Sequence, residues 1–334
     1  MPKALWASSE YFLIADSGAT HTRACLASPG GEIIRYTVTG PGNAFAVGWS
    51  RALTSLREAL GTALHSVKPV GVAVLGSASV DQHGEGSSRI ADSVRQLLPR
   101  ATLKVLGDMR IALEGAFAGG PGIVIVSGTG SVIFGKADES RYVQVGGWGA
   151  LFGDEGSAQW IAREALRRAA HAVDGIGPAT RLPRAFQKHF GAHTFQNLLP
   201  VIYQDPSPAS LGVLAVLVVR LASTGDRVAR TILRQAGEAL AVQAAAAARR
   251  LPLVQARVSC QGSVFSAGKI ILQPLRQTLK KLCPDARLVP AILPPLGGAW
   301  LLALQTAGMT PTREAIAVFH RNYHAVFEGR LGKS

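Results

Sequence analysis

The sequence contains few cysteines and few aromatic residues. Its three cysteines, Cys25, Cys260 and Cys283, are isolated from one another, so they indicate neither a CxxC metal motif nor a disulfide framework. We expect them to be ordinary reduced thiols, mostly buried. Aromatic residues make up only 6% of the chain, which leaves few stacking platforms for nucleic acid.

Long hydrophobic runs are also missing. The longest apolar stretch, Leu211–Val219, is about half the length that a bilayer-spanning helix needs. The opening "MPKALWASSE" has a lysine but no apolar core behind it, so no signal peptide is indicated. These features predict a cytoplasmic protein without a membrane partner.

The composition is otherwise that of a basic globular protein. The 334 residues suggest about two domains, and 48% apolar residues are enough for a sizeable core. The net charge of +14 could indicate a nucleic-acid partner, but the arginines are spread along alanine-rich helices. We therefore expect no nucleic-acid partner and a solvated basic surface that could attract an anionic substrate such as a nucleotide.

Strand and helix patterns alternate along the first part of the chain. Apolar strands are predicted over residues 11–17, 70–76 and 101–107, with helices over 46–64, 87–99 and 109–119. This alternation is typical of an α/β fold with a largely parallel sheet. From about Trp148 onward the pattern is mostly helical, with one strand-like stretch, "ARVSCQGSVF".

One unit of the pattern occurs twice. "YFLIADSGATHTRACLASPGGEIIRYTV" and "GIVIVSGTGSVIFGKADESRYVQVGG" are both three-stranded meanders, interrupted after the first strand by a corner of small residues. The repetition indicates an internal duplication. Glycine lets a backbone approach a ligand and present its N–H groups, so the two corners together predict a phosphate-binding site rather than two plain turns. Asp16 could then hold Mg²⁺ through water. Neither corner is a Walker loop.

Several motifs resemble those of N-acetylglucosamine kinases and of the wider activator-ATPase-like group. They are "DSGATHT", "LGSAS", "GDMRIALEGAFAGGPG", "VSGTGS", "GGWGALFGDEGSAQWIAREAL", "CQGSVF" and "PPLGGAWLLAL", and the resemblance runs from about residue 11 to 305. The resemblance implies an α/β, duplicated ribonuclease-H-like (actin-like ATPase) fold, with two lobes and a central cleft. It divides the chain into residues 1–118, completed by a helix at about 312–328, and residues 119–311.

The resemblance also implies a role for individual residues. Asp108 matches the catalytic base. The residues matched to phosphate binding are Ser17, Gly18, Ala19, Thr20 and Thr22 in the first corner and Ser127, Gly128, Thr129, Gly130 and Ser131 in the second. Those matched to adenosine are Gly262, Ser263, Gly297 and Gly298, and those matched to the sugar are Asn43, Ser77, Asp108, Gly147 and Asp154. His21 and Gln261 depart from the family pattern, which usually has a basic residue and a glycine there.

The residues themselves leave alternatives open. Asp108 follows a strand and precedes a helix, which suits a ligand site at the carboxyl end of a sheet but also an ordinary helix cap. Asp154 and Asn43 have similar alternatives as a helix cap and a turn-stabilising residue. The eight histidines suggest no zinc site.

We therefore predict an ATP- and Mg²⁺-dependent kinase whose partners are ATP and a small amino sugar. The acceptor is expected to be the 6-hydroxyl of N-acetylglucosamine, with glucosamine and N-acetylmuramic acid as alternatives. Alternatives of other classes are an activator ATPase of a 2-hydroxyacyl-CoA dehydratase or benzoyl-CoA reductase, and a non-catalytic sugar or nucleotide sensor. Dimers are common among related kinases, so a homodimer stays open.

Overall fold

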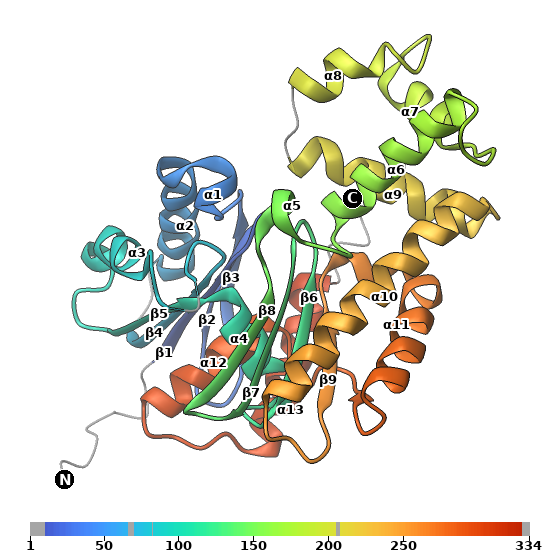
Figure 1. Cartoon of the computed structure of the whole chain (residues 1–334). Helices are drawn as coiled ribbons and strands as arrows, with labels where there is room; N and C mark the ends of the chain where they lie inside the picture. Colours follow the sequence, from blue (N-terminus) through green and yellow to red (C-terminus); the bar gives the residue numbers. More distant parts are fainter. Residues whose placement is uncertain (1–10, 66–69, 82, 205–207, 329–334) are drawn as a thin grey trace. The chain divides into compact units, whose positions relative to one another are not determined.

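The computed structural model describes residues 11–65, 70–81, 83–204 and 208–328 (Figure 1). The amino-terminal stretch on which the signal-peptide prediction rests lies outside these ranges. The chain divides into two compact units, Met1–Gly120 with Pro290–Ser334, and Pro121–Val289. Residues 290–311, which the sequence analysis placed in the second domain, group here with the first unit.

The first unit is built on a five-stranded mixed sheet. Its strands are β1 (Tyr11–Ser17), β2 (Thr22–Ala27), β3 (Ile33–Thr39), β4 (Val70–Ser77) and β5 (Thr102–Gly107). They lie in the order β3-β2-β1-β4-β5, with β1, β4 and β5 parallel and β2 antiparallel to its neighbours. The carboxyl ends of the three parallel strands therefore share one edge of the sheet.

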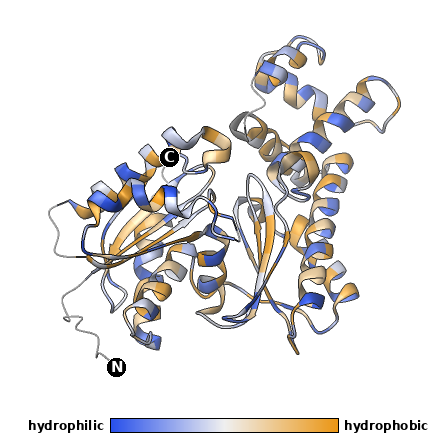
Figure 2. Ribbon diagram, turned by 60° about the vertical axis from the view of Figure 1, so that its left-hand side comes forward, coloured by the Kyte–Doolittle hydropathy of each residue, from blue (hydrophilic) through white to orange (hydrophobic). Residues whose placement is uncertain are grey.

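Helices cover both faces of this sheet. They are α1 (Ala44–Val47), α2 (Trp49–Leu64), α3 (Ser87–Val94), η1 (Arg95–Leu97), α4 (Asp108–Phe117), α12 (Pro295–Thr306), α13 (Arg313–Tyr323) and η3 (His324–Glu328). Side chains alternate along β1, so Phe12 and Ile14 join the core with α4, α12 and α13, whereas Leu13 and Ala15 join the core with α2 and α3. Covering both faces explains why the central strands β1 and β4 are almost wholly apolar and buried. The apolar colour of strands in this sheet is visible in Figure 2.

The second unit repeats the same topology. Its strands are β6 (Gly122–Ser127), β7 (Ser131–Asp138), β8 (Arg141–Gly146), β9 (Arg257–Gln261) and β10 (Arg287–Leu288). The strands lie in the order β8-β7-β6-β9-β10, which corresponds strand by strand to β3-β2-β1-β4-β5 in the first sheet. The strand directions are also the same. The duplication and the α/β fold class predicted from the sequence are confirmed.

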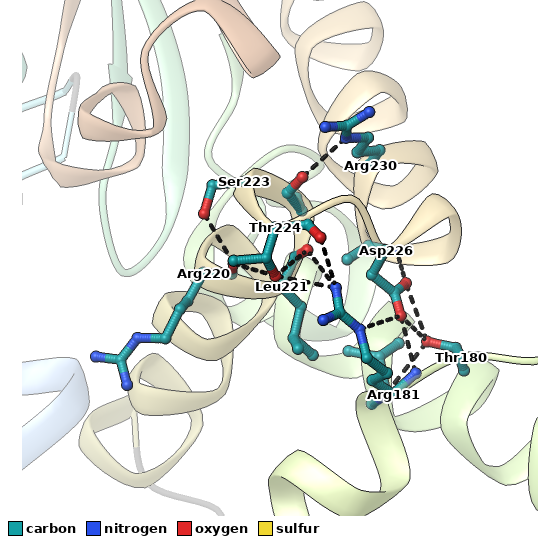
Figure 3. Close-up of polar contacts among 11 residues, drawn as sticks. Thr180, Arg181, Arg220, Leu221, Ser223, Thr224, Asp226 and Arg230 are labelled. Carbon is teal, nitrogen blue, oxygen red and sulfur yellow. Dashed lines mark hydrogen bonds and ion pairs between the residues drawn. The ribbon is translucent and has the colours of Figure 1, made fainter.

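The second unit contains most of the helical residues. Its helices are α5 (Gly149–Phe152), α6 (Ala158–Val173), α7 (Leu182–Phe190), α8 (Leu198–Gln204), α9 (Pro208–Ser223), α10 (Arg227–Arg250), η2 (Ser263–Ala267) and α11 (Lys269–Leu282). The long α10 packs against the sheet and against α11, and one continuous apolar core joins the sheet to α6, α7 and α9. A polar network around Asp226, at the amino end of α10, links α9, α10 and the segment before α7 (Figure 3).

Two helices predicted from the sequence are interrupted. The helix expected over 46–64 is two helices, because Gly48 has a left-handed φ of 79° and breaks the run between α1 and α2. The helix expected over 87–99 ends its α-helical part at Val94 and continues as η1. The two-residue strand β10 was not expected, since so short a strand leaves almost no periodic signal.

Candidate functional site

Three polar residues meet at the edge of the first sheet where the parallel strands end. Asp16 pairs in register with Gly76, and Ser77 pairs with both Ser17 and Gly107. Asp108 directly follows Gly107, the last residue of β5, and is the first residue of α4. Parallel α/β sheets place ligands at this edge, so the strand register brings Asp16, Ser77 and Asp108 to the position where a site is expected.

Asp108 has an electrostatic environment suited to proton transfer. Burial, and after it the negative charge of Asp16, raise the pKa of the Asp108 carboxyl to about 7, while backbone N–H groups at the start of α4 partly oppose the rise. The carboxyl is therefore divided between its acid and base forms near neutral pH. A general base works best when its pKa lies close to the working pH.

Asp16 supplies the second carboxylate of this edge. Burial raises its pKa, and the charge of Arg23, its cross-strand neighbour on β2, lowers it. The negative charge of two carboxylates at this edge attracts a divalent cation, and the carboxylate oxygens of Asp16 are ligands that Mg²⁺ accepts. The donor set thus fits the metal that the sequence prediction placed at Asp16.

In the first corner, the two buried hydroxyls face the protein. Ser17 and Thr22 are 1% and 0% exposed, and their hydroxyl oxygens lie 3.2 Å apart. The Ser17 hydroxyl also donates to the carbonyl of Gly42 at 3.5 Å. These side chains hold the hairpin together, so the tip from Gly18 to His21, which is partly exposed at Gly18 and Ala19 and exposed at Thr20 and His21, is the part of the corner open to a ligand.

The loop after β3 is tied to this corner. Gly42 donates its N–H to the carbonyl of Gly18 at 2.9 Å, and a Cβ atom on Gly42 would lie 1.8 Å from the Ser17 hydroxyl oxygen. Ser79 donates its hydroxyl to the Gly42 carbonyl at 3.0 Å and accepts the Ala44 N–H at 2.8 Å. The sequence analysis did not single out Gly42 or Ser79, because their role depends on contacts about 35 residues apart.

Asn43 caps the short helix α1. Its side-chain oxygen accepts the N–H of Phe45 at 2.9 Å, which is the turn-stabilising alternative considered for this residue. A contact with a sugar would therefore come from the Nδ2 donors of Asn43. Ser77 is buried and its hydroxyl accepts the N–H of Ser79 at 3.1 Å.

The second corner repeats the construction of the first. The Ser127 hydroxyl donates to the Gly156 carbonyl at 3.0 Å, as Ser17 donates to Gly42. Ala158 donates its N–H to the Gly128 carbonyl at 2.9 Å, as Gly42 does to Gly18. The duplication therefore extends to single hydrogen bonds, and each corner is fastened to the loop that follows its meander.

The residues from Gly128 to Ser131 of the second corner are held by further hydrogen bonds. The Ser131 hydroxyl donates to the Glu155 carbonyl at 3.0 Å, and Gly128 donates its N–H to the Gly130 carbonyl at 2.9 Å. Thr129, between them, is partly exposed. The open part of this corner is therefore its tip, as in the first corner.

Asp154 lies against the second corner rather than capping a helix. A Cβ atom on Gly130 would lie 2.8 Å from an Asp154 carboxylate oxygen, and the carboxylate accepts the N–H groups of Ser131 and Gly149. Ser157 caps α6 instead, by accepting the Trp160 N–H at 3.1 Å. Asp154 also has a left-handed φ of 58°, a conformation that costs a non-glycine residue about 1–3 kcal/mol. Such strain is often kept at functional positions.

The charge state of Asp154 depends on several neighbours. Burial raises the pKa of its carboxyl, and the hydrogen bonds from backbone N–H groups and the charge of Arg163 lower it. Arg163 also donates to the carbonyl of Ala150 in α5. Between β8 and α5, Gly147 has a left-handed φ of 75° and lies against Val132 and Gln144, and Trp148 is 73% exposed.

The glycines matched to adenosine have different surroundings. Gly262 has a φ of 114°, and a Cβ atom there would lie 2.1 Å from the carbonyl oxygen of Ser127, so the turn 262–263 lies directly beside the second corner. Gly297 and Gly298 are buried in α12 of the first unit, where a Cβ atom on Gly298 would lie 1.8 Å from the Ile111 carbonyl oxygen of α4. Gly298 lets α12 approach α4 closely, whereas a Cβ atom on Gly297 would lie 2.6 Å from the Leu293 side chain. The contact of both glycines with a nucleotide stays a prediction.

Within the described part of the chain, no group of three or more His, Cys, Asp or Glu residues is arranged to hold a metal ion. The described helices include none that combines the length and apolar character needed to cross a bilayer.

Comparison with known proteins identifies relatives over most of the chain. The profile of the BadF/BadG/BcrA/BcrD ATPase family matches residues 15–303. An N-acetylmuramic acid/N-acetylglucosamine kinase of Clostridium acetobutylicum is 26% identical over 84% of this chain and 94% of its own. An N-acetyl-D-glucosamine kinase of Dictyostelium discoideum is 28% identical over 90% of this chain and 99% of its own.

A solved structure agrees with these matches. It comes from Chromobacterium violaceum, is provisionally named an N-acetylglucosamine kinase, and is 27% identical with a TM-score of 0.70. The comparison covers 89% of this chain and 100% of that one.

Proposed function

The chain belongs to the BadF/BadG/BcrA/BcrD ATPase family, and from this premise we propose that it is an ATP-dependent kinase of an amino sugar. The acceptor is the 6-hydroxyl of N-acetylglucosamine, with glucosamine and N-acetylmuramic acid as alternative substrates. These are the compounds in the names of its curated relatives. The observation that carries the proposal is Asp108, a carboxyl with a pKa of about 7 at the ligand-binding edge of a duplicated ATPase fold.

Asp108 acts as the general base. The sugar hydroxyl oxygen attacks the γ-phosphorus of ATP, the bond from that phosphorus to the bridging oxygen breaks, and ADP leaves. The hydroxyl proton passes to a carboxylate oxygen of Asp108. The position of Asp108 in the first turn of α4 favours its ionised form, because the amino end of a helix stabilises negative charge.

Asp16 is the residue that would hold Mg²⁺, through water. When bound, the ion supplies positive charge against the phosphoryl oxygens. Burial first, and the charge of Asp16 second, raise the pKa of Asp108.

The two corners bind phosphate oxygens through the backbone of their exposed tips. Ala19 and Thr20 serve in the first corner and Thr129 and Gly130 in the second, because the N–H groups of Gly18 and Gly128 already donate within their own hairpins, to the carbonyls of His21 and Gly130. The buried hydroxyls of Ser17, Thr22 and Ser127 hold the corners in shape. Gly262 and Ser263 provide the adenosine side of the second corner. Asn43, Gly147 and Asp154 contact the sugar.

The test is ADP release from ATP and Mg²⁺ across a panel of N-acetylglucosamine, glucosamine, N-acetylmuramic acid and glucose. We expect sugar-dependent release with at least one amino sugar and a fall in kcat of about 10²–10⁴-fold in Asp108→Asn. Asp92→Asn, an exposed aspartate on α3, is the matched control and should keep full activity. Turnover near the wild-type level in Asp108→Asn would refute the role of this residue, and no release with any amino sugar would refute the function.

The activator-ATPase alternative finds little support in the cysteines. Such proteins need cysteines as ligands of an iron–sulfur cluster. Cys25 is fully buried in β2, where burial raises the pKa of its thiol, and burial raises the pKa of Cys260 in β9 to about 12. Cys25 is buried and Cys260 partly buried, which leaves both side chains poorly placed to bind a cluster at the protein surface.

A further inference from the structure

Two histidines lie side by side near the end of the described chain. His320 is in the last turn of α13, and His324 begins the π-helical turn η3. Their Nε2 atoms are 3.1 Å apart and their ring centroids 4.3 Å apart. His320 is exposed and His324 partly exposed, so both rings can be reached from solvent.

The backbone that carries the two rings is fixed to the core. Phe319 is fully buried and stacks on Trp300, with ring centroids 5.1 Å apart. Phe327 packs against Tyr36 of β3 at 5.1 Å and against Tyr323 at 4.8 Å. Aromatic contacts thus anchor the helix before and after the histidines, which keeps their backbone spacing constant.

We propose that His320 and His324 form a two-ligand binding site for a divalent transition-metal ion of the class that prefers imidazole, such as Zn²⁺, Ni²⁺ or Cu²⁺. Bonds from zinc to histidine nitrogen are about 2.0–2.1 Å long. Two such nitrogens are about 2.9 Å apart at a right angle and about 3.3 Å apart at the tetrahedral angle. The observed 3.1 Å lies between these values, so the spacing of the two nitrogens fits one ion, and the rings turn to direct both lone pairs at it.

Binding exchanges a proton for the metal. In the hydrogen-bonded pair, one Nε2 donates and the other accepts, whereas both must offer lone pairs to an ion. The shared proton therefore moves to the other ring nitrogen or to solvent, and water completes the coordination. Two protein ligands are fewer than the three or four of a resident zinc site, so this ion exchanges with solution. Mg²⁺ prefers oxygen ligands and is not retained.

The same spacing occurs elsewhere without the same geometry. His189 and His193 are also four residues apart, but α7 ends at Phe190 and Gly191 turns the chain with a left-handed φ of 66°. His193 is therefore not one helical turn above His189. This pair provides a control that matches the sequence spacing and differs in the helix.

The experiment uses the full chain without an affinity tag. Calorimetric titrations with Zn²⁺, Ni²⁺ and Mg²⁺ compare the wild type with His320→Ala, His324→Ala and the double control His189→Ala/His193→Ala. We expect one Zn²⁺ or Ni²⁺ ion per chain in the wild type and in the control, at least tenfold weaker binding in each single variant, and no binding of Mg²⁺.

A second measurement follows the thermal unfolding midpoint with and without Zn²⁺. A ligand of the folded state raises this midpoint, so the rise should occur in the wild type and in the control and disappear in the two single variants. Equal Zn²⁺ affinity in the wild type and His324→Ala, or loss of binding in the control, would overturn the proposal. Neither metal binding nor the unfolding midpoint depends on kinase activity, so a negative result here would not contradict the proposed function.

Discussion

At the scale of single residues, Asp108 combines properties that favour catalysis over stability. Its pKa is raised to about 7 by burial and by Asp16, far above the ordinary value of an aspartate. Ionising such a group works against folding, because the unfolded chain holds the charge at lower cost. Each unit by which folding raises the pKa costs about 1.4 kcal/mol once the carboxyl is ionised. The left-handed backbone conformation of Asp154 also lowers the stability of the fold.

We therefore predict opposite effects of pH on activity and on stability. With a pKa of about 7 for Asp108, kcat/KM should rise about tenfold per pH unit below 7 and level off above it. The contribution of this group to stability is fully present below pH 4 and is lost as the pH rises through 7. Asp108→Asn should accordingly be more stable than the wild type at pH 8, and the difference should vanish near pH 4.

The measurements are initial rates from pH 5.5 to 8.5 and urea unfolding at pH 4.5 and 8. Asp92→Asn again serves as the control and should follow the wild type in both. A stability gain of equal size at the two pH values would show that the Asn side chain acts through packing and not through ionisation of Asp108.

At the scale of elements, Asp226 holds together the helical part of the second unit (Figure 3). Its carboxylate caps α10 by accepting the Ala229 N–H at 2.9 Å, and it also accepts the Thr180 hydroxyl and the Arg181 N–H. The Arg181 guanidinium in turn donates to the Thr224 carbonyl at 3.1 Å, near the end of α9. One carboxylate thereby joins α9, α10 and the residues before α7.

We predict that Asp226→Ala destabilises the protein by about 2–4 kcal/mol, because the buried N–H of Ala229 loses its helix cap and the part-buried donors of Thr180 and Arg181 lose their acceptor at the same time. Burial alone raises the pKa of Asp226, but these hydrogen bonds and the charge of Arg181 outweigh it and lower the pKa below its ordinary value. The stabilisation is therefore present above pH 4 and lost as the pH falls through the lowered pKa.

Urea unfolding followed by circular dichroism at pH 7 and pH 3 tests this. The gap between the wild type and Asp226→Ala should narrow at pH 3, and Asp174→Ala, an exposed aspartate at the end of α6, should leave stability within about 0.5 kcal/mol. A gap that stayed constant between the two pH values would mean that the charge of Asp226 contributes nothing.

Element-level features were the easiest to predict from the sequence. Apolar runs that end at Asp16, Ser127 and Gly107 locate the strand ends, because periodicity and breakers are local signals. The inward orientation of the Ser17 and Thr22 hydroxyls was not predictable, since it depends on Gly42 across the fold. The approach of two helices at Gly298 likewise depends on a contact between segments nearly 200 residues apart.

At the scale of the whole molecule, each unit has its own apolar core, but only the second unit is formed by one continuous segment of the chain. Residues 121–289 include all strands of the second sheet and the apolar core that covers it. In the first unit, Phe12, Ile14 and Ile111 share a core with Trp300, Leu296 and Phe319, which come from the end of the chain. A segment ending at residue 120 therefore lacks one layer of helices against its sheet.

We predict that residues 121–289 fold alone, with cooperative unfolding, whereas residues 1–120 do not, because large buried side chains leave their sheet uncovered. The two parts of the first unit meet near the break, where Leu293 donates its N–H to the Gly115 carbonyl at 2.9 Å. A short glycine–serine linker from residue 120 to residue 290 should therefore restore a folded unit without residues 121–289. Circular dichroism and amide exchange of the three fragments test this. Cooperative folding of residues 1–120 alone would contradict the prediction, because it would mean that their sheet is stable without α12 and α13. If the linked fragment did not fold, the first sheet would need the second unit in order to fold.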